Sequence, residues 1–206
     1  MKKEVFIMHD FKALSRQAHT LVIFKSLHEV PVFEKLLDTL AVCESDSDKA
    51  IEKYSDFVAE LFAYSDNLTE YMLKLVLENE NLFMLKKGEG KETGALLEEC
   101  LANELAVIEE LSQIPSDEII SKIDYDGFLP RYATQKLDFS QIYADRIHAI
   151  GQYGYGIYSQ YHVFVIKDGK IVPVEYPDDI KLSDLHNYER ERQEVINNTL
   201  ALLKGK

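Results

Sequence analysis

Apolar residues recur at intervals of three and four positions from Phe11 to about Ile150. This interval matches the turn of an α-helix and places the apolar side chains of each segment on one face. Each helix can then bury that face and leave its polar face in water. The pattern predicts about six helices, at residues 10–28, 31–43, 47–65, 67–88, 94–113 and 138–150, with a further short helix starting at Pro115.

Residues at the ends of these segments support the boundaries. Pro31 suits the first position of a helix because its missing N–H would have no partner there. Asn67 and Glu70 have the spacing of a capping box. Two lysines precede Gly88, where positive charge favours the negative end of the helix dipole.

The pattern changes at Gly151, where the chain becomes rich in glycine and tyrosine. Two β-branched runs follow, at 163–166 and 171–174, and an Asp-Gly pair lies between them. Such a pair between two apolar runs predicts a β-hairpin. A last helix is predicted at 183–203, with Gly205 closing it.

Charge divides the chain at the same place. The formal charge is -13, and residues 1–150 contain 16 Lys+Arg and 28 Asp+Glu, against 7 and 8 in residues 151–206. We therefore predict a mainly α fold with a small β element: an acidic, bundle-like helical domain at 1–150, then a β-hairpin and a C-terminal helix at 151–206. The excess of carboxylates argues against nucleic-acid binding through a basic face and against docking on an anionic membrane.

Composition narrows the class of protein further. The apolar fraction of 46% is ordinary for a globular chain. The apolar stretch at 21–24 is far shorter than the roughly 20 residues of a membrane span, and no signal-peptide pattern opens the chain, so a cytoplasmic location is expected. Cys43 and Cys100 lie far apart in the sequence and match neither a disulfide framework nor a metal-binding spacing.

Motifs for phosphate or metal binding are weak. Residues 88–93 resemble a phosphate loop, but Glu92 follows the lysine and the segment follows a helix, so a mobile loop is expected. His19 and His28 are expected on different faces of one helix, too far apart to share a metal ion. The glutamate pairs at 98/99 and 109/110 are expected to be solvated.

The tyrosine- and glycine-rich run at 151–162 allows two interpretations. Its rings could form a platform for a base, a sugar or a peptide, or they could cover one face of the hairpin while the glycines relieve crowding. A small-molecule enzyme built around this run with His162 and Asp168 ranks last, because no base, nucleophile and orienting group form a recognisable arrangement. Asp178 and Asp179 are expected in a turn rather than as a catalytic pair.

Four elements near the end of the chain occur in a specific order. They are Tyr161-His-Val-Phe-Val-Ile, Ile171-Val-Pro-Val-Glu-Tyr-Pro-Asp-Asp-Ile, Leu182-Ser-Asp-Leu-His-Asn-Tyr-Glu189 and Gln193-Glu-Val-Ile-Asn-Asn-Thr-Leu-Ala-Leu-Leu-Lys-Gly205. Together they resemble the segment ahead of the phosphate loop in a bacterial family of AAA+-type P-loop ATPases whose cellular role is unassigned. The resemblance covers about residues 155–206, a quarter of the chain.

The resemblance implies that the chain is the N-terminal region of an ATPase and that the phosphate loop lies beyond it. ATP and Mg²⁺ would bind to the presumed full-length protein, and the 206 residues alone are not expected to hydrolyse ATP. By resemblance, the element before the last helix folds over adenine, so Leu185, His186, Asn187 and Tyr188 are the candidate adenine-side residues. Asn187 stands where the family has glycine, and asparagine tolerates the left-handed backbone best after glycine.

Burial of Leu185 and Tyr188 is expected whether they face adenine or belong to the core of the last helix. The helical part would serve as a module for a protein partner, a substrate or self-association. The alternative is a self-standing helical interaction or adaptor domain. The first hypothesis expects the reading frame to continue into a strand and a phosphate loop, and the second expects no effect of nucleotide on the melting temperature.

Overall fold

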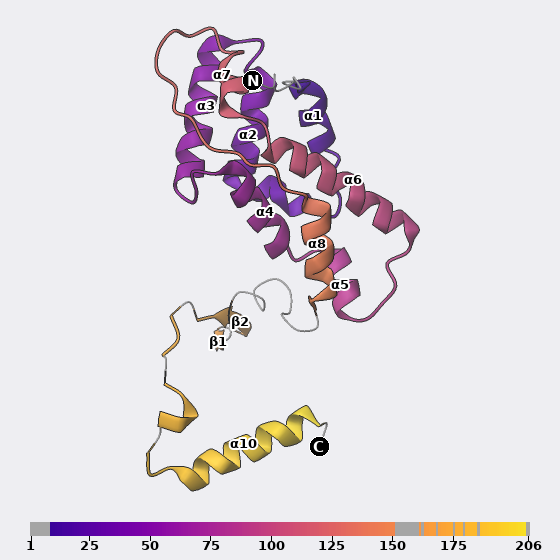
Figure 1. Ribbon diagram of the computed structural model, residues 1–206, viewed down its shortest axis with the longest axis vertical. Helices are drawn as coiled ribbons and strands as arrows, with labels where there is room; N and C mark the ends of the chain where they lie inside the picture. Colours follow the sequence, from indigo (N-terminus) through magenta and orange to yellow (C-terminus); the bar gives the residue numbers. More distant parts are fainter. Residues whose placement is uncertain are drawn as a thin grey trace, which may run out of the picture. The chain divides into compact units, whose positions relative to one another are not determined.

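The computed structural model describes residues 9–150, 161, 163–167, 169–174, 176–178, 180–184 and 186–204. The chain divides into two compact units, Met1–Gln160 and Tyr161–Lys206. The first is helical and the second contains an antiparallel strand pair and a helix (Figure 1). The predicted fold class, mainly α with a small β element, is confirmed.

The first unit is built from short helices wrapped around one core (Figure 1). Helices α2 and α3 pack against each other, and α6 contacts α1, α4 and α8. In chain order the elements are α1 (Phe11–Ala18), the 3₁₀ helix η1 (Lys25–Glu29), α2 (Pro31–Val42), α3 (Ser47–Phe62), α4 (Leu68–Glu78), α5 (Leu82–Gly88), α6 (Ala95–Ser112), α7 (Ser116–Ile120) and α8 (Phe139–His148).

Side-chain caps fix where these helices begin. The carboxylates of Asp10, Asp46 and Asp138 accept hydrogen bonds from backbone N–H groups in the first turns of α1, α3 and α8. Asn67 caps α4 as predicted, by accepting from the N–H groups of Thr69 and Glu70. The capping box is incomplete, because the Asn67 N–H donates to a neighbouring serine hydroxyl instead of to the glutamate.

Two of the predicted helices are interrupted. The segment predicted at 10–28 ends its α-helix at Ala18, turns through 19–24 and continues as η1. The segment predicted at 67–88 breaks after Glu78, where Asn79 takes an extended backbone with a ψ of 120°. The side chain of Asn81 then caps α5 by accepting from the N–H of Met84. Periodicity alone missed both breaks, since apolar residues continue at helical spacing across them.

Glu104 on α6 holds the first of these breaks in place. Its carboxylate accepts backbone N–H groups from Val22, Ile23 and Phe24 at 2.8 to 3.1 Å, and the residue is buried. Three successive N–H groups in a non-helical turn have no helical partners, so a buried acceptor must satisfy them. We call residues 19–30 the hook, because they leave α1, turn against α6 and enter α2.

Residues 121–138 form a long extended connection from α7 to α8, which we call the strap (Figure 1). The hydroxyl of Tyr54 on α3 donates to the carbonyl of Pro130 at 2.6 Å. Ala133 exchanges backbone hydrogen bonds with the start of α4, and the N–H of Gln135 donates to the Thr69 hydroxyl. The strap is therefore tied to the bundle at successive points, although it contains no regular element.

The second unit confirms the predicted hairpin. Strands β1 (Phe164–Lys167) and β2 (Lys170–Pro173) pair antiparallel, with Lys167 opposite Lys170. Gly169 in the two-residue loop has a φ of 74°, a conformation that glycine adopts without steric cost. Asp168 lies outside the described residues.

The last helix begins later than predicted. A 3₁₀ turn, η3 (Leu182–Asp184), comes first, and α10 spans Glu189–Leu203 rather than 183–203. Asn187 separates them with a φ of 65°, and a left-handed residue cannot continue a right-handed helix. The predicted C-terminal cap, Gly205, lies outside the described residues.

Replacing Glu104 tests its role in fixing the hook. Glu104→Ala should lower the free energy of unfolding by about 3 kcal/mol, because buried N–H groups lose their acceptor. Glu104→Gln keeps one acceptor oxygen and should lose less. Urea denaturation measures both. Exposed Glu110→Ala on the same helix is the control and should change stability by less than about 0.5 kcal/mol; equal losses for Glu104→Ala and Glu110→Ala would contradict this role.

Candidate functional site

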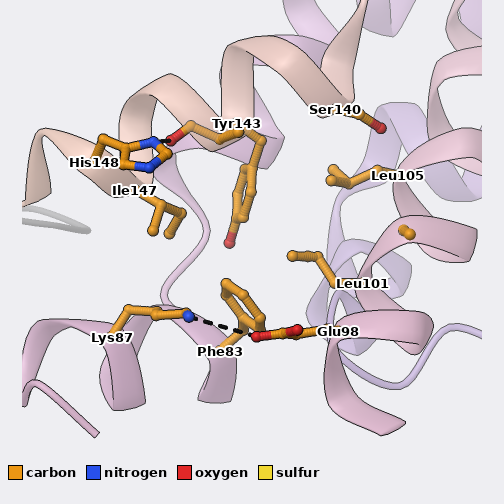
Figure 2. A pocket seen from close by; sticks show the side chains of 11 residues that line it. Phe83, Lys87, Glu98, Leu101, Leu105, Ser140, Tyr143, Ile147 and His148 are labelled. Atoms are coloured by element: carbon orange, nitrogen blue, oxygen red, sulfur yellow. Dashed lines mark hydrogen bonds and ion pairs between the residues drawn. The ribbon is translucent and has the colours of Figure 1, made fainter. Parts of the chain in front are cut away.

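A cleft of about 300 Å³ opens between α5, α6 and α8. Its lining comes from three segments that are far apart in the sequence, and Figure 2 shows how they converge. We call it the α5/α6/α8 cleft. Its lining residues are Phe83, Lys87, Glu98, Leu101, Ala102, Leu105, Ser140, Tyr143, Ala144, Ile147 and His148.

Aromatic rings form the floor of the cleft. Phe83 and Tyr143 lie with ring centroids 6.4 Å apart, and both rings are buried (Figure 2). Behind them, Phe24 of the hook packs edge-on against Tyr143 at 5.8 Å. The Tyr143 hydroxyl accepts a hydrogen bond from the Asn81 amide, and burial raises the pKa of Tyr143 to about 12, so the ring stays neutral at physiological pH.

Charged groups stand at the rim. Lys87 Nζ lies 5.3 Å from the Phe83 ring centroid and 3.6 Å from the carboxylate of Glu98. The Thr93 hydroxyl donates to Glu98 at 2.7 Å, and this hydrogen bond, followed by the charge of Lys87, lowers the pKa of Glu98. The rim therefore presents one cation and one anion above an apolar floor.

His148 stands on the α8 side of the rim (Figure 2). Its Nδ1 lies 2.8 Å from the carbonyl oxygen of Ala144, which can only accept, so Nδ1 carries the proton. Nε2 is then the acceptor of the neutral ring. The cleft thus combines an apolar body with hydrogen-bonding groups at one side, an arrangement suited to binding one large apolar side chain or a small amphipathic molecule.

The sequence did not reveal this cleft. Phe83, Leu101 and Tyr143 each read as core positions of separate helices, and nothing in their spacing says that the helices leave a gap between them. The available indication was the four-residue spacing of lining residues on one helix, as in Leu101 and Leu105 on α6 and Tyr143 and Ile147 on α8.

The predicted adenine-side residues lie in the second unit, between η3 and α10. His186 is exposed, and Asn187 has the left-handed backbone described above. Tyr188 is 57% exposed, so the expectation that it is buried is wrong: it stands at the start of α10, and its ring is open to solvent. Leu185 lies outside the described residues. The assignment of these four residues to adenine stays a prediction.

The histidine prediction is wrong in its geometry. His19 and His28 were expected on different faces of one helix, but the hook brings their rings together, with centroids 5.3 Å apart and planes inclined by 11°. No group of three or more His, Cys, Asp or Glu residues that could hold a metal ion occurs among the described residues.

The structure also shows the surroundings of other residues that the sequence analysis considered. Glu109 is not simply solvated, since its carboxylate accepts from the N–H of Phe139 at the start of α8. Cys43 is buried, and burial raises the pKa of its thiol to about 11. The run at 151–160, with His162, Asp168 and Asp179, lies outside the described residues.

The loop at 88–94 follows helix α5, as the sequence indicated, and leads into α6 rather than forming a phosphate loop. The backbone N–H of Lys91 donates to the carbonyl of Lys86 at 2.8 Å, and Thr93 is buried against Glu98. These bonds anchor the loop at the edge of the α5/α6/α8 cleft.

Comparison of the chain with protein-family models, with curated proteins and with solved structures finds no match. In the part of the chain that the structure describes, no helix combines the length and the apolar character needed to cross a bilayer.

A fluorescent probe tests whether the cleft binds apolar ligands. Anilinonaphthalene sulfonate should fluoresce with the native protein, because its rings suit the floor and its sulfonate suits Lys87. Ala144→Trp should fill the cleft and remove most of this fluorescence. Ala13→Trp, at an exposed position of α1, is the matched control. Equal fluorescence from both variants would show that the dye binds elsewhere.

Proposed function

We propose that this chain is the N-terminal region of a cytoplasmic AAA+-type ATP-binding protein. In this proposal the helical unit binds a protein partner, a substrate or a second copy, and the segment between η3 and α10 faces the adenine of ATP. ATP and Mg²⁺ would be held chiefly by the ATPase domain that the sequence resemblance implies. The observation that carries the adenine role is the left-handed backbone of Asn187 beside the exposed ring of Tyr188.

The backbone at Asn187 supports the proposal because the resemblance places glycine at this position. With a φ of 65°, Asn187 takes the conformation for which glycine is the usual residue. In this proposal the asparagine keeps the turn that redirects the chain from η3 into α10. The asparagine Cβ is an addition to that turn, and a ligand approaching the backbone would have to accommodate it.

The exposed ring of Tyr188 is a second observation that supports the proposed adenine role. An aromatic ring that is 57% exposed can stack on a planar base, which needs an open π-face. The first turn of α10 carries Glu189 and Glu191. These carboxylates suit the positive end of the helix dipole and repel phosphate, so this end of α10 favours the uncharged base over the phosphate chain.

A self-standing helical interaction domain is the second candidate, and the α5/α6/α8 cleft favours it. A cleft with an aromatic floor and a charged rim can receive a partner side chain without any nucleotide. The two candidates differ in the response to ATP: the adaptor predicts an unchanged melting temperature when ATP is added to the protein containing its complete reading frame.

Substitution of Tyr188 tests the adenine role. In the protein with its complete reading frame, Tyr188→Ala should raise the dissociation constant of a fluorescent ATP analogue by roughly tenfold, since base stacking on an aromatic ring contributes about 1–3 kcal/mol. Fluorescence anisotropy measures the constant. Tyr176→Ala is the matched control, because Tyr176 lies in the same unit and is 90% exposed.

Asn187 provides a second arm of this experiment. Asn187→Gly should keep or tighten ATP binding, because glycine adopts the left-handed backbone freely. Asn187→Val should weaken it, because a β-branched residue resists that conformation. ATP binding that is unchanged in both Tyr188→Ala and Asn187→Val would reject the adenine role of this segment.

A further inference from the structure

The hook brings two imidazole rings into a stack. His19, just beyond the end of α1, and His28, in η1, have ring centroids 5.3 Å apart and nearly parallel planes. His28 is half-buried, and its ring also makes a T-shaped contact with Phe33 of α2, with ring centroids 5.4 Å apart. The stack therefore lies where α1, η1 and α2 meet.

A hydrogen bond fixes the tautomer of His28. Its Nε2 lies 3.1 Å from the carbonyl oxygen of Ala18, the last residue of α1, and a carbonyl can only accept. Nε2 therefore carries the proton of the neutral ring, and Nδ1 is the nitrogen that takes up a second proton. This bond ties η1 back to the C-terminal end of α1.

Burial opposes that second proton most strongly. Lys25 on η1 and His19 add smaller unfavourable contributions, so the pKa of His28 is lowered from 6.5. The Ala18 carbonyl acts in the opposite direction but does not reverse the shift. On the α2 side, the His28 ring contacts the apolar ring of Phe33. Glu29 is the next residue after His28 in η1. Just beyond α4, the Asn79 side-chain amide donates a hydrogen bond to the hydroxyl of Ser26 in η1.

We propose that His28, stacked on His19, is a pH-sensitive switch that holds the hook closed when the His28 ring is neutral and opens it when that ring is protonated. A protonated His28 ring in this stack is disfavoured first by its burial and then by repulsion from Lys25 and His19. The switch depends on neither the ATPase assignment nor any ligand.

Opening of the hook would change the structure of the α5/α6/α8 cleft. Between the two histidines, the N–H groups of Val22, Ile23 and Phe24 bind Glu104, and the Phe24 ring supports Tyr143 in the cleft floor. A hook that leaves Glu104 withdraws that ring from Tyr143. Acid should therefore loosen the cleft through contacts that are all within the first unit.

The sign of the pH dependence follows from the lowered pKa of His28. The unfolded or opened chain takes up the proton near pH 6.5, before the closed hook does. The closed state is therefore fully favoured above 6.5 and loses stability as the pH falls from 6.5 toward the lowered value. Uptake of one proton changes the opening equilibrium by up to roughly tenfold for each pH unit in that window.

Hydrogen exchange measured by mass spectrometry tests the switch in the intact chain. After correction for the intrinsic rate, exchange in residues 19–30 should rise between pH 7.5 and pH 5.5. In His28→Gln, whose amide can still donate to the Ala18 carbonyl, the rise should disappear. His19→Gln, at an exposed position, removes one ring of the stack and should reduce the rise without threatening the fold.

Exposed His148→Gln on α8 is the matched control and should keep the full rise. The same acid-induced exchange in the wild type and in both His19→Gln and His28→Gln would overturn the proposal. Loss of the rise in His148→Gln, or exchange that increases equally over all of residues 9–150, would overturn it as well, because the opening would then not originate in the hook.

Discussion

The hydrogen bonds between the Glu104 carboxylate and the backbone of the hook are the interaction on which the first unit depends. The carboxylate brings a buried negative charge to three consecutive backbone N–H groups of the hook, and charge-assisted bonds of this kind are stronger than neutral ones. Because the bonds run from α6 to a turn some eighty positions earlier in the sequence, they fix the direction in which α1 enters the bundle. The hook in turn places Phe24 against Tyr143 and brings His28 under the end of α1. The support that Phe24 gives to the cleft floor and the stacking of the two histidines therefore both depend on this turn.

The strap follows the same physical rule. An extended segment without strand partners must find other acceptors and donors for its backbone, and helix side chains supply them. The Tyr54 hydroxyl donates to the carbonyl of Pro130, and the Thr69 hydroxyl accepts from the N–H of Gln135. Where α8 begins, the Glu109 carboxylate accepts from the N–H of Phe139. Thr69 serves twice, since its hydroxyl also donates to the Ser112 carbonyl at the end of α6. The described part of the first unit leaves no buried side-chain polar atom without a hydrogen bond.

Local rules predicted the helices and the hairpin well, because their information lies in neighbouring residues. Pro31, Asn67 and the Asp-Gly pair before Lys170 act within a few positions, and the structure has a helix or a turn at each. The hook, the break after Glu78 and the cleft were missed for the opposite reason. Glu104 looks like any polar residue of an amphipathic helix until α1 is folded against it, and only the tertiary structure decides whether its charge is solvated or buried. The stacked histidines were misplaced for the same reason, since their spacing was measured along a helix that the buried carboxylate interrupts.

These contacts show that some of the carboxylates behind the negative charge of the chain have structural roles. Three carboxylates of residues 1–150 have structural partners: Glu104 binds the hook, Glu109 accepts from the N–H of the first residue of α8, and Glu98 faces Lys87 at the cleft rim. These carboxylates cannot be exchanged for lysines without loss of a hydrogen bond or an ion pair, so part of the negative charge is required by the fold rather than by a partner. The second unit is nearly neutral, and the carboxylates in the first turn of α10 follow an exposed tyrosine. A search for binding partners should therefore treat the apolar cleft and the segment around Asn187 as separate determinants, since one is built on buried aromatic rings and the other on a backbone turn.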